Sequence, residues 1–181
     1  MAFMPVIALG GIKHTGKSTV GKIVSERLSL PFHDLDDLIL KILPPRWTIR
    51  KWYKEMGEME FKAKEKEALR HYLDENSEKI RILALGGGTL ENMGALKLLK
   101  DSDTEIFILN ERTEILYQRI IVKGIPPFLD ASDPEGSFEK LYTKRTKTLL
   151  NQGDHIIDIH GLNQQQAAEQ VIRLIRSNYG G

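Results

Sequence analysis

The sequence predicts an α/β fold in which a parallel sheet lies between two layers of helices. Two observations predict it. Short apolar runs typical of buried parallel strands alternate with longer helical patterns, and they occupy residues 6–9, 31–33, 80–85, 105–109 and 155–159. A glycine-rich motif also joins the first of these strands to the first helix. Right-handed crossovers between such strands predict a three-layer α/β/α arrangement that binds its ligands at the carboxyl edge of the sheet.

Length and composition indicate one domain that acts on a small molecule. The chain has 181 residues, which is the usual size of a single domain, so residues 1–181 are expected to form one unit. Its 26 basic and 25 acidic residues leave a net charge of +1, which gives no electrostatic reason to expect nucleic acid or a membrane as partner. Cysteine is absent, which excludes disulfides and thiolate chemistry. We expect a monomer or a weak dimer.

The N-terminal residues do not resemble a targeting segment. They lack a basic region, and their apolar stretch is too short for a signal peptide. No apolar run approaches the length of a membrane span. A cytoplasmic location is therefore expected.

The first element carries a phosphate-binding loop at residues 11–18, which fits G-x-x-x-x-G-K-S/T. Gly11 and Gly16 allow the backbone to turn so that successive amides point inward. Lys17 is placed to neutralise the β and γ phosphates, and the Ser18 hydroxyl is placed to bind Mg²⁺. The motif predicts a site for ATP or GTP, and the candidate nucleotide-binding residues are Gly11, Lys13, Thr15, Gly16, Lys17, Ser18 and Thr19.

An acidic cluster follows the second strand. If this segment is extended, alternation places Asp34 and Asp36 on the same side, near the phosphate-binding loop. Asp34 could then bind Mg²⁺ opposite Ser18, and Asp36 could accept the proton of an acceptor hydroxyl. The alternative is that these carboxylates cap a helix beginning near Asp37, and we assign that role to Asp37.

Three glycines follow the third strand directly. Gly86, Gly87 and Gly88 lie where bare backbone can approach a ligand and donate amide hydrogen bonds. Their position at the sheet edge favours an acceptor-binding turn. The alternative is a tight turn between a strand and a helix.

Two cations near the expected lid could act on a nucleotide or its phosphates, and they are Arg119 and Lys123. Residues 123–136 are rich in breakers and turn formers, which favours a mobile lid over an ordinary surface loop. Lys123 lies near the start of this segment and could reach the transferring phosphate. Arg119 ends the preceding helical stretch, where it could meet adenine or phosphate, or be a solvated charge.

The order of these motifs resembles the shikimate kinase family. The resemblance rests on residues 11–18, on Asp-Leu-Asp at 34–36, on Gly57-Glu58 followed by Phe61-Lys62, and on the three glycines at 86–88. It implies a P-loop kinase fold with a five-stranded parallel sheet. It also implies a helical substrate-binding region at residues 34–72 and a lid at residues 120–138.

The resemblance also implies an activity and residue roles. The implied activity is ATP- and Mg²⁺-dependent conversion of shikimate to shikimate 3-phosphate, a step of aromatic amino-acid biosynthesis. By matching positions, Lys17 and Ser18 bind ATP and Mg²⁺, and Asp34 is the metal-side carboxylate. Asp36 contacts the shikimate hydroxyls, the three glycines form the substrate turn, and Arg119 is the adenine-side arginine. Lys17, Asp36 and Lys123 are the expected catalytic residues.

Three departures from the family pattern concern the acceptor. Lys62 stands where the family usually has an arginine, which keeps the charge but loses the planar guanidinium. The lid offers no arginine, which leaves Lys123 as its cation. Glu139 falls near the position of a second carboxylate-binding arginine, where it would repel a carboxylate unless Lys140 or Arg145 turns in.

These departures leave more than one function open. The leading hypothesis is a kinase for a small polyol acid, with shikimate as the substrate. A second is a kinase for a different acceptor, such as a sugar acid, nucleoside or nucleotide. A third is a catalytically weak ATP-binding regulatory protein.

Overall fold

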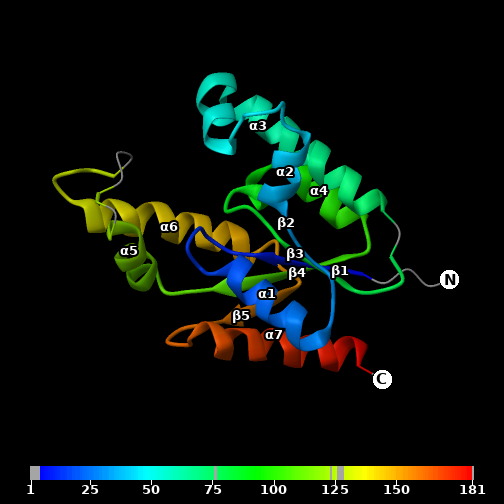
Figure 1. Cartoon of the computed structure of the whole chain (residues 1–181). Helices are drawn as coiled ribbons and strands as arrows, with labels where there is room; N and C mark the ends of the chain where they lie inside the picture. Colours follow the sequence, from blue (N-terminus) through cyan, green and yellow to red (C-terminus); the bar gives the residue numbers. More distant parts are fainter. Residues whose placement is uncertain (1–4, 76, 123, 126–128, 181) are drawn as a thin grey trace.

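A five-stranded parallel sheet organises the chain. The computed structural model describes residues 5–75, 77–122, 124–125 and 129–180, and the sheet has the strand order β2-β3-β1-β4-β5 (Figure 1). All four neighbouring pairs of strands are parallel, which confirms the predicted sheet. The strands are β1 (Val6–Gly10), β2 (Phe32–Asp34), β3 (Arg81–Ala84), β4 (Thr104–Asn110) and β5 (His155–Asp158).

The central strand is β1, and its five residues are all buried. It pairs with β3 on one side and with β4 on the other, so its backbone groups are satisfied on both edges. A strand buried on both faces needs an apolar sequence throughout, and Val-Ile-Ala-Leu-Gly provides one. The residues after Gly10 therefore begin at the middle of the carboxyl edge of the sheet.

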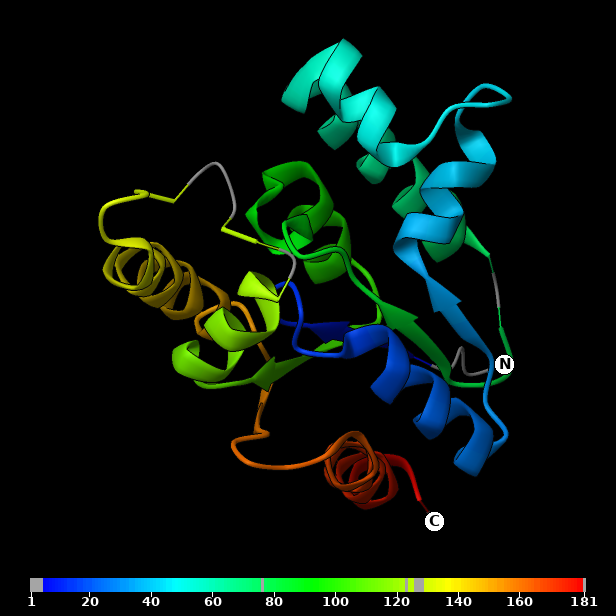
Figure 2. The same ribbon diagram turned by 60° about the vertical axis from the view of Figure 1, so that its left-hand side comes forward.

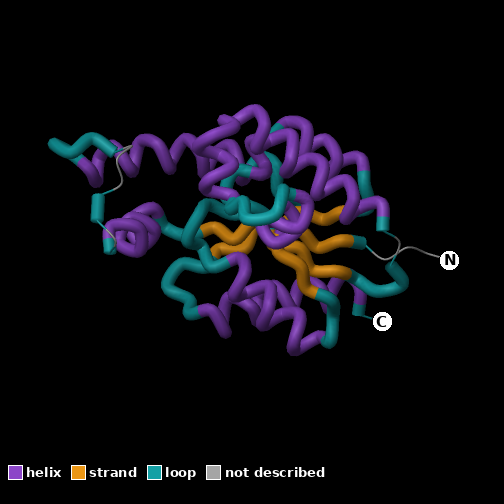
Figure 3. The backbone as a smooth tube through the Cα atoms, turned by 45° about the horizontal axis from the view of Figure 1, so that its top comes forward, coloured by secondary structure: helices purple, strands orange, loops and turns teal. Residues whose placement is uncertain are grey.

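Helices cover both faces of the sheet (Figures 2 and 3). Ile7 and Leu9 of β1 pack in one apolar cluster with α1 and α7, whereas Val6 and Ala8 pack in a second cluster with the helices of the opposite face. This alternation gives the three predicted layers. The helices are α1 (Lys17–Leu28), α2 (Leu35–Ile42), α3 (Ile49–Asp74), the 3₁₀ helix η1 (Thr89–Glu91), α4 (Met93–Asp101), α5 (Thr113–Ile121), α6 (Pro134–Leu150) and α7 (Gln164–Tyr179).

The region expected to bind substrate consists mainly of α2 and α3. The first part of α3 projects away from the sheet (Figure 1), and the helix is interrupted at Gly57, whose φ is +85° and ψ is 174°. Trp52 and Leu69 are buried, whereas the exposed fraction of Met59 is 85%. Only part of the apolar content of α3 therefore belongs to the core.

The expected lid lies between α5 and α6. Leu129 is buried, Asp130 accepts a hydrogen bond from the backbone N–H of Ser132 at 2.8 Å, and Asp133 caps the N-terminus of α6. Lys123 lies outside the described residues. Among the helices that are described, none is long and apolar enough to cross a membrane.

We predict that Leu69→Ala destabilises the protein far more than Met59→Ala on the same helix. Leu69 is fully buried, so its truncation should lower the free energy of unfolding by about 2–5 kcal/mol. Met59 is exposed, so its truncation should change that free energy by no more than about 0.5 kcal/mol. Urea denaturation measures both, and equal effects would contradict the packing of α3 described above.

Candidate functional site

The carboxyl ends of β1, β2 and β3 border one cleft of about 1280 Å³. Segments that follow these strands line it, together with parts of α3, α5 and α6. The cleft brings together these predicted site residues: Lys13, Gly16, Lys17, Ser18, Thr19, Asp34, Asp36, Gly86, Gly87 and Gly88. It also includes residues that were not predicted, among them Ile49, Arg50, Phe61, Glu65, Tyr142 and Arg145.

The phosphate-binding loop has the backbone conformation that its glycines permit. Gly11 has a φ of +146°, and a β-carbon there would lie 2.8 Å from the carbonyl oxygen of Leu109. Gly16 has a φ of +88° and precedes α1 as its N-cap residue. The first helical residue is therefore Lys17, and the N-terminus of α1, which favours anions, begins at the cleft.

Lys17 spans the loop. Its Nζ donates hydrogen bonds to the carbonyl oxygens of Gly11 at 3.0 Å and Ile12 at 3.1 Å. Burial lowers the pKa of Lys17 to about 8, while the carboxylates of Asp36 and Asp34 act in the opposite direction. The Lys17 ammonium group is thus held at the cleft, and the nearby carboxylates offset only part of the cost of burying its charge.

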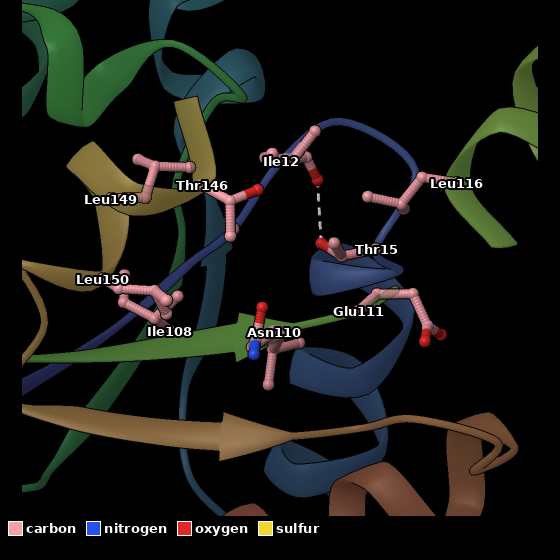
Figure 4. Close-up of a pocket in the computed structure, with 11 residues that line it drawn as sticks. Ile12, Thr15, Ile108, Asn110, Glu111, Leu116, Thr146, Leu149 and Leu150 are labelled. Carbon is pink, nitrogen blue, oxygen red and sulfur yellow. Dashed lines mark hydrogen bonds between the residues drawn. The ribbon is translucent and has the colours of Figure 1, made fainter. Parts of the chain in front are cut away.

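Thr15 faces the interior rather than the cleft. Its hydroxyl donates to the carbonyl oxygen of Ile12 at 2.9 Å (Figure 4). The side chain lines a separate cavity of about 10 Å³ behind the loop, which is the size of one water molecule. Thr15 is therefore buried behind the loop and does not line the cleft, and a nucleotide contact by Thr15 stays a prediction.

Asp34 connects the starts of two helices. Its Oδ2 accepts a hydrogen bond from the Ser18 hydroxyl at 2.5 Å, and its Oδ1 accepts one from the backbone N–H of Asp36 at 3.0 Å. The second bond makes Asp34 the N-cap of α2, so the assignment of that role to Asp37 is wrong. Aspartate in an extended conformation is a preferred N-cap, and α2 begins at Leu35 for this reason.

Asp36 lies in the first turn of α2 and not on an extended segment, so the predicted alternation is wrong although both carboxylates reach the cleft. Burial raises the pKa of Asp36, and the neighbouring Asp34 carboxylate adds to this effect against the opposing charge of Lys17. A raised pKa strengthens a carboxylate as a proton acceptor.

The glycine turn, residues 86–88, approaches these carboxylates closely. A β-carbon at Gly86 would lie 3.3 Å from Glu65 Oε1 and 3.6 Å from Asp36 Oδ1. At Gly87 it would lie 3.3 Å from the backbone nitrogen of Lys13. The absence of side chains on the turn therefore leaves room between the acidic groups and the phosphate-binding loop.

Glu65 is a buried carboxylate that the sequence motifs did not predict. Its Oε1 accepts from the Thr89 hydroxyl at 2.6 Å and its Oε2 accepts from Asn92 Nδ2 at 2.9 Å. Burial raises the pKa of Glu65, and these two hydrogen bonds oppose that rise. Its helical spacing to Phe61 and Leu69 places it within the apolar stripe of α3, and this is the signal that could have revealed it.

The oxygen atoms of Ser18 and Asp34 fit a magnesium site. A hydroxyl and a carboxylate are ligands that Mg²⁺ accepts, and Mg²⁺ usually retains water and phosphate oxygens in its remaining positions. No cluster of three or more His, Asp or Glu side chains suited to a metal occurs in the described part of the chain. A site that depends on a bound nucleotide for further ligands is consistent with both observations.

The cations differ in where they point. Lys62 Nζ lies 2.6 Å from Glu58 Oε1, and Lys62 is not among the cleft-lining residues. Arg145 lines the cleft, where its Nε donates to Glu91 Oε1 at 2.6 Å and its Nη2 to the carbonyl oxygen of Gly87 at 3.4 Å. Arg145 therefore turns in, whereas Glu139 is exposed and does not line the cleft.

Arg119 braces the phosphate-binding loop from outside the cleft. Its Nη1 donates to the carbonyl oxygen of His14 at 2.9 Å, and its Nη2 pairs with Glu111 Oε2 at 3.1 Å. The Glu111 side chain is almost completely buried, which fixes one end of this connection. An adenine contact by Arg119 stays a prediction.

Comparisons with known proteins agree on one family. The family model described as "Shikimate kinase" matches residues 13–176. A shikimate kinase of Thermodesulfovibrio yellowstonii is 31% identical over 173 residues, covering 94% of each chain.

Solved structures of shikimate kinases share the fold. The structure from Acinetobacter baumannii in complex with shikimate has a TM-score of 0.80 at 26% identity, covering 97% of this chain and 95% of the other. The structure from Bacteroides thetaiotaomicron has a TM-score of 0.76 at 21% identity, with coverage of 97% and 98%, and supports the fold alone. The chain is therefore a kinase and belongs to the shikimate kinase family.

Proposed function

We propose that this protein transfers the γ-phosphoryl group of ATP to the 3-hydroxyl of shikimate. The observation that carries the proposal is the position of Asp36, in the same cleft as the phosphate-binding loop and the glycine turn. Family membership and the similarity to a kinase structure that contains shikimate support this acceptor. We further infer a cytoplasmic enzyme of aromatic amino-acid biosynthesis.

ATP supplies the phosphoryl group, and Mg²⁺ bound to its phosphates neutralises charge. The loop amides, Lys17 and the N-terminus of α1 would hold the phosphates, and Ser18 with Asp34 would hold the cation. Lys17, Ser18 and Asp34 all line the cleft, and the Ser18 hydroxyl donates to Asp34. Positioning and charge neutralisation are the main requirements of phosphoryl transfer, and this chain provides groups for both.

Asp36 would accept the proton of the acceptor hydroxyl. As the hydroxyl oxygen bonds to the γ-phosphorus, the bond from that phosphorus to the β,γ-bridging oxygen breaks and ADP leaves. The proton moves to Asp36, whose raised pKa makes it a better proton acceptor than an ordinary aspartate. The glycine turn would donate backbone amides to the acceptor.

A kinase for a different acceptor is the second candidate. The observation that favours it is the ion pair between Lys62 and Glu58, which takes the expected carboxylate-binding cation away from the cleft. A sugar acid or another hydroxyl compound would then replace shikimate without a change in the nucleotide site.

An ADP-formation assay with Mg²⁺ and ATP, with and without shikimate, tests the proposal. We expect shikimate-dependent ADP release and a phosphorylated product at the 3-hydroxyl. Release stimulated by another hydroxyl acid and not by shikimate would support the second candidate instead.

We predict that Asp36→Asn lowers kcat by about 10²–10⁴-fold and leaves ATP binding nearly unchanged. The amide cannot accept the hydroxyl proton, but it keeps the size of the side chain. Asp37→Asn is the matched control, because Asp37 is exposed and does not line the cleft. Turnover measures the first effect and the thermal shift with ATP the second, and turnover that survives in Asp36→Asn would refute the assigned role.

We also predict that ATP binding takes up a proton near pH 8 and weakens as pH rises above 8. The pKa of Lys17 in the free protein is about 8, and phosphate charges should raise it in the complex. Above the free-state pKa, binding must therefore protonate Lys17. Titration calorimetry in buffers of different ionisation enthalpy measures the uptake.

Lys17→Arg is the control for this pH effect, because a guanidinium stays charged throughout the range. The proton uptake near pH 8 should disappear in that variant. Equal uptake in Lys17→Arg and the wild type would show that another group is responsible.

A further inference from the structure

The cleft contains two carboxylates beside the glycine turn, which are Asp36 and the buried Glu65. Asp36 and Glu65 both lie near Gly86, where a β-carbon would be within 3.6 Å of an oxygen atom of each. Burial raises the pKa of both groups. An acceptor that carries its own carboxylate would be repelled here unless a cation binds it.

Among the described residues, four cations line the cleft, and they are Lys13, Lys17, Arg50 and Arg145. Lys13 and Lys17 belong to the phosphate-binding loop, which faces the nucleotide. Arg145 is already engaged by Glu91 Oε1 at 2.6 Å and by the carbonyl oxygen of Gly87. Arg50 is the remaining cation, and it lies on α3, the helix that also carries Glu65.

The Arg50 side chain makes no hydrogen bond or ion pair with any residue that the structure describes. It extends from the first turn of α3, directly after Ile49, which also lines the cleft. The adjacent Lys51 is directed elsewhere, because its Nζ lies over the Trp47 ring at 4.7 Å from the centroid. Arg50 therefore lines the cleft with a guanidinium group that is available to bind a ligand.

The position of Arg50 is unfavourable without an anion. The N-terminus of a helix carries partial positive charge, and the first turn of α3 contains no acidic residue to balance it. A cation placed there gains stability when an anion binds beside it. The guanidinium also offers the planar pair of donors that a carboxylate accepts, which a lysine does not.

We propose that Arg50 binds the carboxylate of the acceptor and so determines specificity, in place of Lys62. Lys62 is held by Glu58 away from the cleft, whereas Arg50 lies on the same helix and faces it. The inference rests on the proposed function, because it concerns the acceptor of that reaction.

Steady-state kinetics of Arg50→Ala, with shikimate and with its methyl ester, test the inference. The KM for shikimate should rise by at least about tenfold, with a much smaller change in kcat. The preference for shikimate over the ester, measured as a ratio of kcat/KM values, should fall because only the free carboxylate pairs with Arg50. Arg50→Lys should recover part of the loss.

Lys54→Ala is the matched control, since Lys54 lies one turn further along α3, is exposed and does not line the cleft. Its KM for shikimate should stay at the wild-type value. An unchanged KM in Arg50→Ala, with normal wild-type turnover of shikimate, would overturn the inference alone. A large KM increase in Lys62→Ala with none in Arg50→Ala would also overturn it. Absence of shikimate-dependent turnover in the wild-type protein would instead overturn the proposed function, and the inference with it.

Discussion

The carboxylate of Asp34 is the point on which the arrangement of the site depends. One of its oxygen atoms accepts a hydrogen bond from Ser18 at the start of α1, and the other caps α2 through the backbone N–H of Asp36. The same side chain therefore sets the distance between the phosphate-binding loop and the acidic turn that presents Asp36. A shift of Asp34 would therefore move the proposed metal ligand and the proposed proton acceptor together.

The strand order makes this contact possible. Because β1 lies at the centre with β3 and then β2 beside it, the segments after these three strands meet at one edge. The connection through Arg119, from buried Glu111 to the His14 carbonyl oxygen, holds the phosphate-binding loop from the β4 side. On the other side, Glu65 joins α3 to Thr89 and Asn92, just beyond the glycine turn. Hydrogen bonds therefore connect the elements on both sides of the phosphate-binding loop and the glycine turn.

Sequence patterns predicted the parts of the site that follow buried strands, because both strands and glycine-rich turns have strong local signatures. The five strands, the phosphate-binding loop and the turn at residues 86–88 belong to this class. The sequence patterns did not predict which aspartate caps α2, because any of several neighbouring carboxylates can take the N-cap position. Glu65 and Arg50 were not predicted because α3 contains many charged residues. Only the packing of this helix shows which of its charged side chains line the cleft and which face solvent. The orientation of Lys62 depends on its ion pair with Glu58, four residues earlier on the helix. That spacing allows the ion pair but does not ensure that it forms.

The most direct test of the account is a crystal structure of the protein with ADP, Mg²⁺ and shikimate bound together. We expect the 3-hydroxyl of shikimate to lie within hydrogen-bond distance of Asp36, and Ser18 and Asp34 to hold the cation. We also expect the acceptor carboxylate beside Arg50. A complex in which that hydroxyl faces away from Asp36, or in which the cation binds elsewhere, would refute these assignments.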